Sequence, residues 1–145
     1  MPEATTADHV IIKKSDHTLT VMDGIAAIKT YQVALGRGGS GPKMHQGDNK
    51  VPEGNYRIVS RNAHSHFHLS LKISYPEPRD IEEARRNNRP PGGDIMIHGI
   101  RNGMGWVGSF HRLVDWTAGC VAVTDQEMDE IWRIVPDGTP VDIEP

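Results

Sequence analysis

The sequence predicts a mainly β protein of one domain, with an antiparallel sheet that forms a sandwich or a barrel-like structure. Its length of 145 residues suits a single domain. About seven or eight short apolar segments are separated by turns rich in Gly, Pro and Asp, which is the pattern of an all-β fold. Only one segment has a strong helical period, and a second is weakly helical.

The first third of the chain predicts a strand at 10–14 and then a hairpin. The pair Asp23-Gly24 separates two apolar arms, and a Gly after Asp accepts the positive φ of a two-residue hairpin turn. The first arm covers 19–22. The second begins at Ile25 and is expected to continue to Leu35, since Tyr31, Val33 and Leu35 alternate with polar or small residues.

Residues 36–54 predict a long loop. The segment holds six glycines and two prolines and almost no large apolar residue. A loop of this length inside a compact domain is usually functional or disordered. It lacks the residue order of a phosphate-binding P-loop, so we do not expect it to bind a nucleotide.

The middle of the chain predicts strands at 56–59, 67–73 and 94–98. The clearest is 67–73, where apolar and polar residues alternate strictly. Between them, 80–88 is polar and rich in Glu and Arg, which favours a solvated surface helix.

The C-terminal region predicts one firm helix and a last strand at 140–143. Thr124 is followed three residues later by Glu127, which forms a capping box at the start of a helix. One apolar stripe follows at helical spacing, formed by Met128, Ile131, Trp132 and Val135.

Charge and composition exclude several classes of function. The chain has 16 Lys and Arg against 19 Asp and Glu, a balance that argues against nucleic-acid binding. It has no apolar run near the ~20 residues of a transmembrane segment, and its first residues show no secretory signal. We expect an N-terminal tail at 1–8 and one folded domain at 9–145. The single cysteine excludes an internal disulfide.

Cys120 and His98 are the residues most suited to nucleophilic chemistry. Cys120 follows Gly119, where no side chain blocks approach, and His98 ends a predicted strand. An imidazole beside a thiol can lower the pKa of the thiol and create the reactive thiolate. The alternative is that Cys120 is a small buried packing residue, and spacing alone does not decide between the two.

The chain resembles the YkuD-type L,D-transpeptidases, which are bacterial cell-wall enzymes with a catalytic cysteine. The resemblance rests on His-Gly followed, after about twenty residues, by [Ser/Thr]-x-Gly-Cys-[Ile/Val], and it covers residues 9–145. Matching segments also flank this motif: Tyr31–Gly36, Gly47-Asp48, Pro52–Tyr56, Phe67–Leu71, Gly103–Trp106 and Asp115–Thr124.

The resemblance implies a YkuD-type fold and a role for four residues. Cys120 would attack the carbonyl before the terminal D-alanine of a peptidoglycan tetrapeptide, and His98 would hold the thiol proton in an ion pair and then protonate the leaving amine. The carbonyl of Gly99 would orient the imidazole. The N–H groups of Gly119 and Cys120 would bind the oxyanion. No metal and no cofactor are implied.

One departure from the family concerns the substrate carboxylate. Most members have Arg two residues after the cysteine, where this chain has Ala122, a change shared by the branch with Gly-Cys-[Ile/Val]-Ala-Val-Thr. Arg101 and Arg112 are the expected replacements. Other residues expected near substrate are His68, His111, Trp116 and Thr117.

Two of these expectations have alternatives. His64, His66 and His68 would share one face of a strand and could hold zinc, but we favour a solvent or cleft face because a second cysteine ligand and an H-E-x-x-H motif are missing. His111 either contacts substrate or caps its loop.

Three functions remain open from the sequence. The first is a cell-wall transpeptidase acting on peptidoglycan stem peptides, placed in the periplasm or cell envelope by the resemblance. The second uses the same Cys/His site to hydrolyse peptidoglycan peptides or links between peptidoglycan and a wall protein. The third is a non-catalytic wall-binding module.

Overall fold

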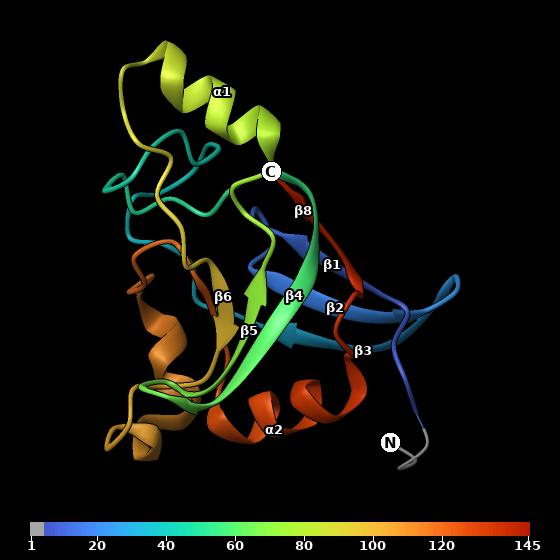
Figure 1. Cartoon of the computed structure of the whole chain (residues 1–145). Helices are drawn as coiled ribbons and strands as arrows, with labels where there is room; N and C mark the ends of the chain where they lie inside the picture. The colour runs from blue at the N-terminus through green and yellow to red at the C-terminus, as the bar shows by residue number, and fades with distance from the viewer. Residues whose placement is uncertain (1–4) are drawn as a thin grey trace.

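The computed structural model describes residues 5–145, and these contain eight strands and three helices. The fold is mainly β, as predicted, with the strands joined in one sheet in the order β3-β2-β1-β8-β4-β5-β6-β7 (Figure 1). The strands are β1 (His9–Lys13), β2 (Thr18–Asp23), β3 (Ala26–Gln32), β4 (Gly54–Ser65), β5 (His68–Ile73), β6 (Met96–His98), β7 (Val121–Ala122) and β8 (Pro140–Glu144).

Most neighbouring strands run antiparallel, but two pairs are parallel. These are β1 with β8 and β6 with β7, so the sheet is mixed. The long strand β4 joins the two halves of the sheet, because its first residues pair with β8 and its later residues pair with β5. The parallel pair β6–β7 places two segments that are distant in sequence beside each other.

The two edges of the sheet are also connected, which gives the barrel-like closure. After β3 the chain forms an isolated antiparallel bridge between Ala34 and Ala122 of β7. Each donates a backbone hydrogen bond to the other, at 3.0 and 2.9 Å. The expected arm through Leu35 therefore stops being a regular strand at Gln32 and continues as a bridge to the other edge.

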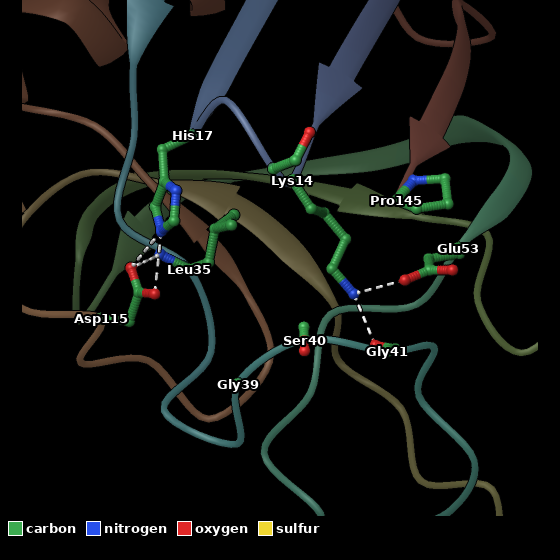
Figure 2. Close-up of a pocket in the computed structure, with 10 residues that line it drawn as sticks. Lys14, His17, Leu35, Gly39, Ser40, Gly41, Glu53, Asp115 and Pro145 are labelled. Atoms are coloured by element: carbon green, nitrogen blue, oxygen red, sulfur yellow. Dashed lines mark hydrogen bonds and ion pairs between the residues drawn. The ribbon is translucent and has the colours of Figure 1, made fainter.

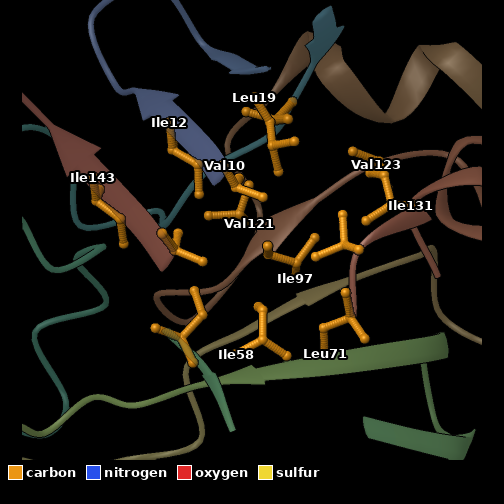
Figure 3. Close-up of a cluster of buried hydrophobic side chains, with 14 of the residues drawn as sticks. Val10, Ile12, Leu19, Ile58, Leu71, Ile97, Val121, Val123, Ile131 and Ile143 are labelled. Carbon is orange, nitrogen blue, oxygen red and sulfur yellow. The ribbon is translucent and has the colours of Figure 1, made fainter. Parts of the chain in front are cut away.

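One buried cluster fills the space between the two halves of the sheet and α2 (Asp125–Ile134). Strands from both halves contribute branched aliphatic side chains, and Ile131 covers them from the helix (Figure 3). The capping box predicted at Thr124 and Glu127 is present, with both reciprocal hydrogen bonds formed. The apolar side of α2, formed by Met128, Ile131 and Ile134, is buried, and this burial holds the helix beneath the sheet (Figure 1).

Two helices differ from the prediction. The surface helix α1 spans Pro78–Arg86 rather than 80–88, because Glu77 and Asp80 form a capping box that starts it earlier. The η1 segment (Gly105–Leu113) was expected to be a loop. It is 3₁₀ helix interrupted at Gly108, where φ is 56°, so it lacks the 3.6-residue period that marks an α-helix in a sequence.

The expected N-terminal tail, 1–8, lies partly outside the described residues. Of the part that is described, Ala7 is buried and its N–H donates to the Ile134 carbonyl at 2.7 Å. This contact joins the segment before β1 to the end of α2. No helix in residues 5–145 is long and apolar enough to cross a membrane.

Candidate active site

His98 ends β6, Cys120 comes directly before the parallel strand β7, and both line one cavity. In the β6–β7 register His98 is opposite Ala122, and Cys120 comes two residues before Ala122. His98 and Cys120 border a cavity of about 400 Å³, lined also by Arg37, Phe67, Asp94, Met96, Arg101, Trp116, Thr117 and Ala118.

The His98 ring is held between aromatic side chains. Phe67 stacks on it with ring centroids 4.4 Å apart, and Trp116 lies at 5.7 Å. Nδ1 is 2.7 Å from the Gly99 carbonyl, which can only accept, so Nδ1 carries the proton and Nε2 is the unprotonated nitrogen. Burial lowers the pKa of His98, and the ring is therefore neutral near pH 7.

The Cys120 thiol is partly exposed and is not hydrogen-bonded to His98 in this conformation. Sγ donates to the Asp94 carbonyl at 3.3 Å. Within residues 5–145 no hydrogen bond joins this thiol to the His98 ring. Burial raises the pKa of Cys120 above its ordinary value, so both groups are neutral at rest. The thiolate–imidazolium pair that the family resemblance implies requires the thiol to leave the Asp94 carbonyl and approach Nε2 of His98.

The turn before Cys120 is organised by the hydroxyl of Thr117. Oγ1 donates to the Cys120 carbonyl at 2.7 Å and accepts from the Gly119 N–H at 3.1 Å. The Gly119 N–H, expected to be an oxyanion donor, is thus already bonded. No partner of the Cys120 N–H is found in the described chain. Gly119 itself is required, since φ is +124° and a Cβ there would lie 2.8 Å from the Lys50 carbonyl.

The start of this turn is fixed to the first hairpin and to the glycine-rich loop. The Asp115 carboxylate accepts from His17 Nε2 at 2.9 Å and from the Leu35 N–H at 2.9 Å, as Figure 2 shows beside a separate cavity of about 210 Å³. Thr117 forms a parallel bridge with Gly36, and its carbonyl accepts from the Arg37 N–H. The long loop therefore begins at the rim of the candidate site.

The structure separates the expected substrate-binding residues into two groups. Arg101, Trp116 and Thr117 line the cavity. Arg112 is instead 3.9 Å from Glu127 at the start of α2 and does not line it.

The two histidines of that set also lie outside the cavity lining. His68 bonds Asp129 of α2 at 2.6 Å. His111 is buried behind Trp116, where its Nδ1 accepts from the indole Nε1 at 3.2 Å.

Arg37 is a lining residue that the sequence analysis did not select. It follows Gly36 in the glycine-rich loop, and the only available signal was that such loops are often functional. A bridge between residues 36 and 117 has no local sequence signature. Within residues 5–145, no group of three or more His, Cys, Asp or Glu side chains is arranged to hold a metal ion.

Comparison with known proteins identifies the family. The family model of the YkuD L,D-transpeptidase catalytic domain matches residues 7–143. YafK of Escherichia coli (strain K12), whose name assigns it provisionally to the L,D-transpeptidases, is 32% identical over 111 residues. That match covers 74% of this chain but only 37% of YafK, so the chain spans about a third of the length of this relative.

Solved structures share the fold at low sequence identity. The helical cell shape determining protein Pgp2 from Campylobacter jejuni has a TM-score of 0.72 at 24% identity, over 97% of this chain and 48% of Pgp2. An L,D-transpeptidase fragment from Xylanimonas cellulosilytica has a TM-score of 0.66 at 16% identity, over 98% of this chain and 62% of the fragment. At these identities the likeness shows the fold alone.

Proposed function

The chain belongs to the YkuD family of L,D-transpeptidase catalytic domains, and we propose that it is a cell-wall cysteine acyltransferase that acts on peptidoglycan stem peptides through a thioester at Cys120. The observation that supports this most is the cavity lined by both His98, at the end of β6, and Cys120, directly before the adjacent strand β7. The substrate places the proposed activity in the periplasm or cell envelope.

The first step requires the thiol to leave the Asp94 carbonyl. Rotation about the Cα–Cβ bond of Cys120 would turn Sγ away from Asp94 and toward His98, which lines the same cavity. Nε2 of the neutral imidazole would then accept the thiol proton as sulfur attacks the substrate carbonyl. A neutral pair that reacts only after this rotation would keep the thiol protonated until substrate is bound.

The remaining steps use the main chain and the same imidazole. The free N–H of Cys120 would donate to the oxyanion of the tetrahedral intermediate. His98 would return its proton to the departing amine nitrogen as the C–N bond breaks, which leaves the thioester. An amine of a second stem peptide would attack the thioester in the transferase reaction, and water would attack it in the hydrolase reaction.

Arg37 and Arg101 are the proposed partners of the substrate carboxylate. Both line the cavity, and Ala122, at the position of the usual family Arg, is fully buried and paired with Ala34. Two guanidinium groups on the rim supply the positive charge that Ala122 lacks. Trp116 and Thr117 would form the adjoining wall.

The experiment that tests the proposed nucleophile is acylation by a carbapenem. Attack of the Cys120 sulfur on the β-lactam carbonyl breaks the ring C–N bond and retains every atom, so intact mass should rise by the full mass of the drug. Cys120→Ala should show no increase. A wild-type protein without adduct, or an equal adduct on Cys120→Ala, would contradict the proposal.

Incubation with purified sacculi separates transfer from hydrolysis. New cross-links in the muropeptides would support the transferase, and free stem peptides or a released wall protein would support the hydrolase. Sacculi that are bound but chemically unchanged would indicate the wall-binding module instead.

A further inference from the structure

The peptide group between Gly99 and Ile100 is hydrogen-bonded at both of its ends. Its carbonyl accepts from Nδ1 of His98 at 2.7 Å, and its N–H, on Ile100, donates to Oδ1 of Asp125 at 2.8 Å. The C=O and N–H belong to one conjugated, planar amide. The carboxylate, the amide and the imidazole therefore form one continuous chain of hydrogen bonds.

Two glycines leave space for this carboxylate. A Cβ added to Gly99 would lie 2.7 Å from Oδ1 of Asp125, and one added to Gly105 would lie 2.5 Å from Oδ2. These glycines belong to different segments, the end of β6 and the start of η1. Asp125 is itself the first residue of α2, where the helix dipole favours a negative side chain.

We propose that Asp125 is a positioning residue for His98, which acts through the Gly99–Ile100 amide to hold the ring with Nδ1 protonated and to strengthen Nε2 as a base. A carboxylate on the N–H side polarises the amide and makes its carbonyl a better acceptor. In serine proteases a carboxylate orients the imidazole by direct contact. Here one peptide group would transmit the same effect. This inference rests on the proposed function of His98 as a base.

Other charged groups face both ends of the chain of hydrogen bonds. Near Asp125, His68 Nδ1 of β5 lies 3.9 Å from Oδ2, and Asp129 and Glu127 belong to the same helix. The groups around His98 are His111 of η1 and the cavity residues Arg37, Asp94, Arg101 and Cys120. A test must therefore change the charge of Asp125 without moving these neighbours.

Asp125→Asn makes that change, because the amide oxygen of Asn can still accept from the Ile100 N–H. NMR titration of the imidazoles, with His98 assigned from His98→Gln, measures the result. We expect the His98 pKa to fall by about 0.3–0.5 unit in Asp125→Asn, in line with the roughly 10–30% by which polarisation strengthens a hydrogen bond.

Asp129→Asn is the matched control. Asp129 lies one turn along α2 and is bonded to His68, so its substitution should leave the His98 pKa unchanged. Asp125→Ser, which also removes the charge of the carboxylate, replaces the Asn variant if that does not fold.

An unchanged His98 pKa in Asp125→Asn, or an equal fall in Asp129→Asn, would overturn the inference. The NMR titration measures the His98 pKa whether or not the protein is an active enzyme. The proposed function is tested separately, and it fails if the wild type forms no carbapenem adduct. Where the adduct forms, the acid limb of the acylation rate should also move to lower pH in Asp125→Asn, with a few-fold lower plateau. A purely structural role of Asp125 would leave that limb in place.

Discussion

The Cys120 thiol donates its hydrogen bond to the main-chain carbonyl of Asp94, 26 residues earlier in the chain, at 3.3 Å. Asp94 adopts a left-handed conformation with φ 54°, which Asp tolerates better than most residues. The thiol of Cys120 is therefore hydrogen-bonded to the main chain and not to His98, its candidate base.

This resting contact predicts slow alkylation of Cys120 near neutral pH. Burial raises the pKa of the thiol, so the reactive thiolate is scarce at pH 7 and becomes more abundant as pH rises. The iodoacetamide rate should be below that of a free thiol such as glutathione at pH 7, and should increase about tenfold per pH unit up to the raised pKa. Stopped-time alkylation followed by intact mass measures both rates.

Acylation by a carbapenem should behave differently, because the proposed base His98 takes the proton during attack. His98→Ala should slow acylation by about 10²-fold or more while it changes the alkylation rate above pH 9 only slightly. Equal losses in the two reactions would show that His98 acts on the fold of the site and not as a base.

A side chain at Gly99 should disturb the site and destabilise the protein. Gly99→Ala places a methyl group 2.7 Å from the Asp125 carboxylate and 2.9 Å from the Cβ of His68. We expect a loss of about 1–3 kcal/mol in the free energy of unfolding, as for other overpacked positions. Urea denaturation measures it. Gly93→Ala is the control, because a Cβ at Gly93 meets no atom within 4 Å, and its unfolding free energy should be unchanged or slightly higher.

The sequence predicted those parts of the fold that have a local signature. Alternation marked β5, and the capping box with its apolar stripe marked α2. The hairpin was confirmed, but its two-residue turn is Gly24-Ile25, one residue later than predicted, because Asp23 still pairs with Ala26; Gly24 has φ 61°. The η1 segment was missed because 3₁₀ helix broken by a glycine has no period that a sequence reveals.

Residues brought together by long-range contacts were harder to predict. The pair His98 and Cys120 was found through a motif, and the parallel pairing of β6 with β7 supplies its physical basis. Arg37 reaches the cavity only because the loop bridges to Thr117. The Asp125 carboxylate accepts a hydrogen bond from the Ile100 N–H, and no sequence motif predicts this contact between residues 25 positions apart.

Removal of Arg37 or Arg101 should weaken binding of the peptide donor. Each lines the cavity and can pair with a substrate carboxylate, and a hydrogen bond to a charged group contributes about 1.5–3 kcal/mol. We expect Arg37→Ala and Arg101→Ala to raise KM for the stem peptide by about tenfold or more, with a smaller effect on kcat.

Arg112→Ala is the matched control for these two changes. Arg112 lies near Glu127 and outside the cavity lining, so its loss should leave KM unchanged. Steady-state kinetics with a tetrapeptide donor measures all three variants. A higher KM in Arg112→Ala alone would assign the substrate carboxylate to Arg112 instead of Arg37 and Arg101.

Stability should fall as the solution is acidified below about pH 6.5, because two buried histidines must remain neutral in the folded protein. Burial lowers the pKa of both His98 and His111, whereas in the unfolded chain each has the ordinary value near 6.5. The unfolded state thus binds more protons in this range. The stabilisation is fully present above the unfolded pKa and is lost as pH falls through the lowered folded values.

In a plot of the unfolding free energy against pH, each histidine can add at most about 1.4 kcal/mol per pH unit to the slope. His98→Gln and His111→Gln should each reduce the slope between pH 7 and pH 5, as measured by urea denaturation at several pH values. The exposed His66 provides the control His66→Gln, which should keep the wild-type slope. Burial would raise the pKa of the half-buried Asp48 carboxylate, but hydrogen bonds from Met44 and Lys43 outweigh it and lower this pKa to about 2, well below the tested range. A wild-type slope in both His variants would therefore mean that neither imidazole is held neutral by the fold.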